Sequence, residues 1–163
     1  MPKLVCDTSS IQYLHQTGLL HLLQELGDSV CIPPAVRDEL NEGRRNGVDL
    51  PDIARIPWIK VSHPRGEKDT RLLGDMGPGE TEVMMLTLEK DGFVAVLDDA
   101  VARKRAALLD IPFTGTLGIL LDAKEKGLVS ELKPVLDQLH RLQFYLAENT
   151  RNIILRKAGE LSL

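Results

Sequence analysis

The sequence predicts an α/β fold, a three-layer α/β/α domain with a mainly parallel sheet of four or five strands. Two short apolar runs, residues 4–6 and 93–97, each end directly in aspartate. Apolar runs bounded by small polar residues are typical of buried parallel strands. Segments with helical spacing alternate with these runs, which indicates a parallel sheet covered by helices on both faces. We therefore expect the two strands to be neighbours in the sheet.

Each further element follows from a local pattern. Leucines recur at helical spacing after the first strand, with a break near Gly18. Pro33 and Pro34 stop a short strand and suit the start of the next helix. Residues 46–75 are the least regular part, with many prolines and glycines. Strands are expected at residues 30–32 and, at the sheet edge, 58–61, and helices at 10–26, 35–45, 77–91, 99–109, 116–126, 129–142 and 147–158.

Length and composition narrow the class of protein. The 163 residues, 43% of them hydrophobic, are enough for one domain, which we expect to span residues 1–163. The sequence contains neither an apolar run of membrane-spanning length nor a secretion signal, so we expect a cytoplasmic protein without membrane contact. The two cysteines match no metal-binding spacing and are expected to be buried, reduced thiols.

The charge and aromatic content exclude some forms of nucleic-acid binding. A net charge of −4 argues against coating nucleic acid through bulk charge, although it leaves a nuclease with acidic metal ligands open. Aromatic residues make up only 4% of the chain, which argues against recognition of single strands by stacked aromatic rings.

Acidic residues mark a candidate site. In open α/β sheets the ligand crevice lies beyond the carboxyl ends of the strands, where Asp7, Asp98 and Asp99 are expected. Glu80 heads a helix whose stripe is mostly apolar, so it is expected to face the sheet. Glu39 lies at the edge of the buried face of an earlier helix. The alternatives are helix caps for the aspartates, a dipole-complementing charge for Glu80 and a solvated helix acid at position 39.

The order of these acids resembles the PIN-domain family over essentially the whole chain. The runs at residues 77–80, 98–99 and 114–118 look most like a prokaryotic subfamily related to the VapC-like ribonuclease toxins. The resemblance implies a metal-dependent endoribonuclease that hydrolyses RNA phosphodiester bonds with Mg²⁺ or Mn²⁺. It also implies a role as the toxin of a toxin–antitoxin pair, an antitoxin protein as partner, and a homodimer.

The chemistry of clustered carboxylates agrees with that implication. Two carboxylates about 4 Å apart repel by roughly 4 kcal/mol at an effective dielectric near 20, so a cluster must bind a cation or hold protons. Magnesium or manganese relieves the repulsion and contacts phosphate oxygens directly. On this basis Asp7, Glu80 and Asp99 are expected to bind metal, while Glu39 and Asp98 complete the shell or orient water as further catalytic residues.

Three neighbouring residues are candidates for contact with substrate. Ser9 is expected to hydrogen-bond a ligand carboxylate or water, or else to close the turn after the strand. Arg103 and Lys104 lie one helical turn beyond Asp99 and are expected to meet the RNA backbone. Their alternative is a solvated helix face, in which Arg103 pairs with Asp99 at i,i+4 spacing.

Two other functions compete with a nuclease. A phosphatase of the haloacid dehalogenase type also has an aspartate after its first strand, but it needs a second aspartate two positions later, where this chain has Ser9. A PIN-like protein that binds RNA or a partner without cutting is the other alternative.

Two further segments have expected roles near the site. Residues 46–75 are expected to reshape the groove or to form a lid. Thr114 and Thr116 are expected to cap a helix.

Overall fold

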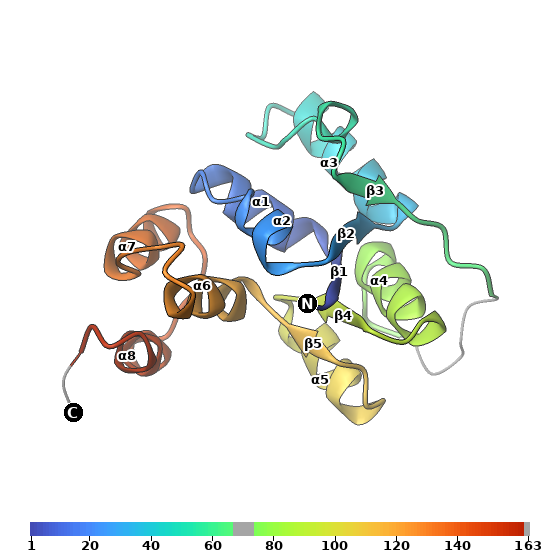
Figure 1. The fold of residues 1–163 in the computed structure, drawn as a ribbon. Helices are drawn as coiled ribbons and strands as arrows, with labels where there is room; N and C mark the ends of the chain where they lie inside the picture. Colours follow the sequence, from blue (N-terminus) through green and yellow to red (C-terminus); the bar gives the residue numbers. More distant parts are fainter. Residues whose placement is uncertain (67–73, 162–163) are drawn as a thin grey trace.

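The sheet contains five parallel strands in the order β3-β2-β1-β4-β5. The computed structural model describes residues 1–66 and 74–161, shown in Figure 1. Leu4 of β1 lies opposite Val94 of β4, so the prediction that these strands are neighbours is confirmed. The strands are β1 (Lys3–Cys6), β2 (Ser29–Ile32), β3 (Ile59–Val61), β4 (Phe93–Val96) and β5 (Phe113–Thr114).

Helices cover both faces of this sheet, which confirms the predicted α/β/α class. Helix α4 packs on β1 and β4 and contacts α5, whereas α2 packs on β2 and α6 packs against α1 and α2 (Figure 1). The helical segments are α1 (Thr8–Gln16), α2 (Leu22–Leu26), α3 (Pro34–Arg45), the 3₁₀ helix η1 (Ile53–Arg55), α4 (Pro78–Glu89), α5 (Ala100–Leu108), α6 (Thr116–Glu125), α7 (Lys133–Arg141) and α8 (Glu148–Lys157).

Some sequence-based helix starts were wrong, and one strand was missed. Helix α1 begins at Thr8 rather than residue 10, because Asp7 caps it, and α7 begins at Lys133 rather than residue 129. The predicted break near Gly18 is confirmed, since α1 ends at Gln16 and α2 begins at Leu22. Gly18 has a φ of +74°, the left-handed conformation that commonly terminates a helix. Strand β5 was not predicted, because its two residues are too short to show a periodicity.

The connection between the strands creates the crevice in which the site lies. The chain builds β1, β2 and β3 in one direction and then returns to place β4 on the other side of β1. This reversal of strand order opens a crevice at the carboxyl ends of β1 and β4, where α/β proteins commonly bind ligands. Asp7 and Asp98 follow these two strands closely, so the topology brings them together.

Helix α3 bridges the two helical layers at this end of the sheet. It contacts both α1 and α4. Glu82 of α4 accepts a hydrogen bond of 2.9 Å from the backbone N–H of Ala35, one of the unpaired amides in the first turn of α3. This contact holds α3 against α4 and places Glu39, one turn further on, beside the crevice.

Other sequence-based expectations concern the cysteines, the irregular segment and the membrane. Cys6 and Cys31 are free and buried, and burial raises the pKa of both thiols, as expected for unreactive structural cysteines. The expected lid lies partly outside the described residues, because residues 67–73 belong to it. Within residues 1–66 and 74–161, no helix has the length and apolar character needed to cross a membrane.

Candidate active site

Asp7 is the central residue of the site. It is 1% exposed and lies between the end of β1 and the start of α1. Its Oδ1 accepts a hydrogen bond of 2.8 Å from the N–H of Ser10, and its Oδ2 accepts one of 3.1 Å from the N–H of Asp98. Because both oxygens are held by backbone amides, the carboxyl group has a fixed orientation in the crevice.

The environment of Asp7 disfavours its negative charge. Burial, followed by the nearby charge of Asp98, raises the pKa of Asp7 from 3.8 to about 7, against the opposing effect of the Ser10 and Asp98 hydrogen bonds. Two carboxyl groups that lie close together at a buried strand end would both ionise readily if a cation were added. Asp7 and Asp98 therefore have the character of a cation site.

Asp98 is held from the other side by Thr116, the first residue of α6. The N–H of Thr116 donates to Asp98 Oδ1 at 2.8 Å, and its hydroxyl donates to Asp98 Oδ2 at 2.6 Å. The hydroxyl of Ser9 also donates to Oδ2, at a longer 3.4 Å. Asp98 thus links β4 to the N-termini of both α1 and α6.

Glu39 approaches the same region from α3. It accepts hydrogen bonds from the hydroxyl of Thr8 and, at 3.2 Å, from the N–H of Gly79. Thr8 follows Asp7 directly and Gly79 precedes Glu80, so Glu39 joins the starts of α1 and α4. A Cβ on residue 79 would lie only 2.8 Å from Glu39 Oε1, so glycine is needed for this close approach.

Asp99 and Glu80 are placed differently from the acids above. Asp99 is exposed and its Oδ2 accepts a hydrogen bond of 2.9 Å from the N–H of Ala102, so it is the N-cap of α5, the alternative role weighed for it. Glu80 is half-buried in the first turn of α4. Its Oε2 lies 2.8 Å from the position of a Cβ on Gly77, so its side chain folds toward the start of the helix.

The described residues hold no preformed metal cage. Within them, no group of three or more His, Cys, Asp or Glu side chains is already arranged around one point. The structure brings Asp7 and Asp98 into direct contact and joins Glu39 to them through Thr8, the next residue along the chain. Carboxylate oxygens are the donors that Mg²⁺ and Mn²⁺ prefer, and the buried Asp7 lies beside a second carboxyl group, so these residues suit a hard divalent ion.

Arg103 lies at the rim of this acidic crevice. A Cβ placed on Gly115 would lie 3.1 Å from Arg103 Nη1 and 3.0 Å from Asp98 Oδ1. The two groups therefore border the same point. The guanidinium carbon lies 5.3 Å from the centre of the Phe113 ring. The Asp99–Arg103 ion pair, weighed as an alternative role for Arg103, is not formed in the described part of the chain, and Lys104 is exposed on α5.

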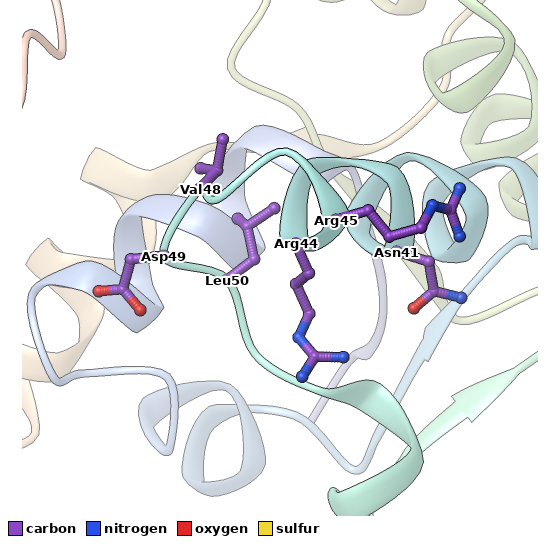
Figure 2. Close-up of a pocket in the computed structure, with 6 residues that line it drawn as sticks. All are labelled: Asn41, Arg44, Arg45, Val48, Asp49 and Leu50. Atoms are coloured by element: carbon purple, nitrogen blue, oxygen red, sulfur yellow. The ribbon is translucent and has the colours of Figure 1, made fainter.

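A separate cavity lies at the end of α3 and belongs to a different surface. Figure 2 shows that its six lining residues come from the last turns of α3 and the loop that follows. It has a volume of about 420 Å³, and Asn41 in its wall is two residues from Glu39, hence on the opposite side of the helix. Arg44 faces Asp52 at 3.6 Å and Asp49 faces His15 at 3.0 Å. The cavity contains none of the acids predicted for the site.

Comparison with known proteins identifies the family. A family model described as a PIN domain matches residues 3–160. The chain belongs to the PIN-domain family. The resemblance predicted from the sequence is therefore confirmed at the level of the family, whereas the relation to VapC-like toxins stays a prediction. A search of curated proteins finds no significant match. PIN domains are generally nucleases that act on RNA, and PIN-domain nucleases generally use divalent metal ions.

Several residues that build the site of this PIN domain were missed or misjudged from sequence. Thr8, Gly79 and Glu82 had no assigned role, and Thr116 was expected only to cap a helix. Thr116 does begin α6, but its hydroxyl binds Asp98. No local pattern reveals this contact, because Thr116 and Asp98 are 18 residues apart in sequence. They meet only because β5 pairs with β4.

Proposed function

We propose that this PIN domain is a metal-dependent endoribonuclease that hydrolyses RNA phosphodiester bonds with Mg²⁺ or Mn²⁺. The observation that carries the proposal is the buried Asp7, whose pKa is raised to about 7 and which lies beside Asp98 at the ends of adjacent strands. Two neighbouring carboxyl groups at a buried position lower the stability of the fold when no cation is bound. Binding of a cation is therefore the simplest explanation for their placement.

The proposed roles follow from the geometry of each residue. Asp7 and Asp98 hold the ion, and Glu39 and Glu80 complete its shell or orient the attacking water. The ion, when bound, supplies charge stabilisation at the phosphate and lowers the pKa of a water ligand. Arg103 at the rim binds the phosphate backbone. Lys104 and Ser9 remain candidates for further contact with RNA or water.

The proposal moves one metal role from Asp99 to Asp98, and it gives Glu80, predicted to bind metal, the role of completing the shell or orienting water. The sequence-based assignment named Asp99, but the backbone N–H of Asp98 bonds to Asp7 and the Asp98 carboxylate lies beside Thr116 and Arg103. Asp99 uses its carboxylate to cap α5. A one-residue change of register at a strand end turns the side chain to the other face, so the two aspartates are not interchangeable.

The direct test is cleavage of single-stranded RNA by purified protein. We expect cleavage when Mg²⁺ or Mn²⁺ is added and none when the metal is chelated, because the ion supplies several kcal/mol of transition-state stabilisation. Fragment lengths on a denaturing gel distinguish internal cuts from removal of end nucleotides. A wild-type protein that cuts no RNA with any divalent metal, yet binds RNA, would support the non-cutting alternative.

The pair Asp98→Asn and Asp99→Asn tests the register of the metal site. Asp98→Asn should lower cleavage by about 100-fold or more, because it removes a ligand charge beside Asp7. Asp99→Asn should change it by less than about 3-fold, because asparagine caps a helix as well as aspartate does. The measurement is kcat/KM on one RNA at saturating metal. The opposite ranking would restore Asp99 as the ligand.

The other predicted partners and roles stay proposals. Membership of the PIN family argues against a haloacid dehalogenase-type phosphatase, which has a different fold. A cognate antitoxin and a homodimer follow from the toxin resemblance alone, and the cytoplasmic location expected from the sequence stays a prediction. An antitoxin-sized reading frame that overlaps or directly precedes this one would support the toxin role.

A further inference from the structure

We infer that Thr116 is a positioning residue that fixes the carboxylate of Asp98 for binding the divalent ion; this inference rests on the proposed function. Thr116 is fully buried, with 0% of its surface exposed. It donates to both oxygens of Asp98, from its hydroxyl at 2.6 Å and from its backbone N–H at 2.8 Å.

Two donors from one residue restrict Asp98 more strongly than a single contact would. They fix the rotation of the carboxylate plane as well as its direction, because each oxygen has its own partner. The backbone N–H belongs to the first turn of α6 and cannot move without that helix. The contact from Ser9 is longer, at 3.4 Å, and adds less restraint.

The arrangement leaves room for a cation on Asp98. Each carboxylate oxygen can accept about two hydrogen bonds or ligand contacts. The contacts described above place two donors on Oδ2, from Thr116 and Ser9, but only one on Oδ1. Thr116 therefore holds Asp98 while Oδ1, which accepts from one donor among the described contacts, keeps capacity for a further ligand contact.

The hydroxyl is the part of Thr116 that can be removed without changing its shape. Valine matches threonine closely in volume but donates no hydrogen bond, whereas serine keeps the hydroxyl and loses a methyl group. Partners that orient a metal ligand typically change metal affinity by about 10- to 100-fold when they are removed. Thr116→Val and Thr116→Ser thus separate the hydrogen bond from the packing.

The test is Mn²⁺ binding to metal-free protein, measured from the electron paramagnetic resonance signal of free Mn²⁺. We expect Thr116→Val to weaken the Kd about 10- to 100-fold and Thr116→Ser to stay within about 3-fold of wild type. Thr114→Val is the matched control, since it makes the same change two residues away on β5 and should leave the Kd unchanged. A folded Thr116→Val with wild-type affinity, or a serine variant as weak as the valine variant, would overturn the inference.

A second readout separates this inference from the proposed function. The ¹³C resonance of the Asp98 side-chain carboxyl, recorded without metal, should move in Thr116→Val and stay near its wild-type position in Thr116→Ser. If wild-type protein neither binds Mn²⁺ nor cleaves RNA, the proposed function fails and the metal role of Thr116 fails with it, while this resonance still reports whether Thr116 orients Asp98. If Thr116→Val does not fold, Thr116→Ala is measured in the same two ways, and an unchanged resonance and Kd contradict the inference.

Discussion

Replacing Asp7 with asparagine is expected to lower the rate of RNA cleavage by about 1,000-fold or more, because metal-ion stabilisation of the transition state is worth several kcal/mol. The asparagine side chain would keep an oxygen able to accept from the N–H of Ser10, the bond by which Asp7 caps α1. It would lose the negative charge that anchors the ion. The measurement is kcat/KM with Mg²⁺ and with Mn²⁺, alongside circular dichroism to show that the fold is retained.

Controls make this prediction specific to Asp7. Asp99→Asn removes one negative charge from the same end of the sheet but from a helix cap, so it should retain cleavage. Cleavage that survives both a chelator and Asp7→Asn would point to a contaminating nuclease or to a mechanism without the ion. A loss of equal size in the two variants would show that general charge, rather than the buried carboxyl group, governs activity.

The strand-end acids were predictable from sequence for a local reason. An apolar run that ends in aspartate identifies both a buried strand and the residue at its carboxyl end, as for Asp7. The choice between Asp98 and Asp99 was not predictable, because both follow the same strand. Only the pairing of β4 with β1 and β5 determines which of them bonds to Asp7 and which is left to cap α5.

The parts of the site that depend on distant contacts were beyond sequence reasoning. Glu39 reaches the crevice because Glu82, 47 residues after Ala35, fixes the start of α3. Thr116 reaches Asp98 because a strand of two residues precedes it. Polar contacts of this kind leave no periodic pattern of apolar residues in the sequence. That periodic pattern is the signal that predicted the helices and the central strands.

A strong pH dependence of stability is the second large expected effect. Burial and the charge of Asp98 raise the pKa of folded Asp7 from 3.8 to about 7. The folded protein then binds more protons than the unfolded chain between these values, so the contribution of Asp7 to stability is full below about pH 4 and falls as pH rises through about 7. The loss should be on the order of 2–4 kcal/mol in the free energy of unfolding.

Other carboxyl groups act in a different range of pH. The hydrogen bond from Arg151 lowers the pKa of Asp137. Burial pushes the pKa of Glu160 up, but hydrogen bonds from the N–H groups of Leu132 and Lys133 outweigh it and lower the pKa overall. Both groups contribute stability above their unfolded pKa and lose it as pH falls further into acid. Their effect on stability opposes that of Asp7 only at the acid end of the pH range over which Asp7 titrates.

Urea unfolding of metal-free protein from pH 4.5 to 8 measures the effect of Asp7. Wild type should lose stability across this range, and Asp7→Asn should lose much less, since it carries no titrating group at this position. Subtracting the two curves removes the contribution of the four histidines, which both proteins share. Adding Mn²⁺ at pH 7.5 should stabilise wild type and leave Asp7→Asn unchanged, because binding to the folded state adds its own free energy. Equal slopes in the two proteins would mean that Asp7 is ionised throughout, and the raised pKa would then no longer support a cation site.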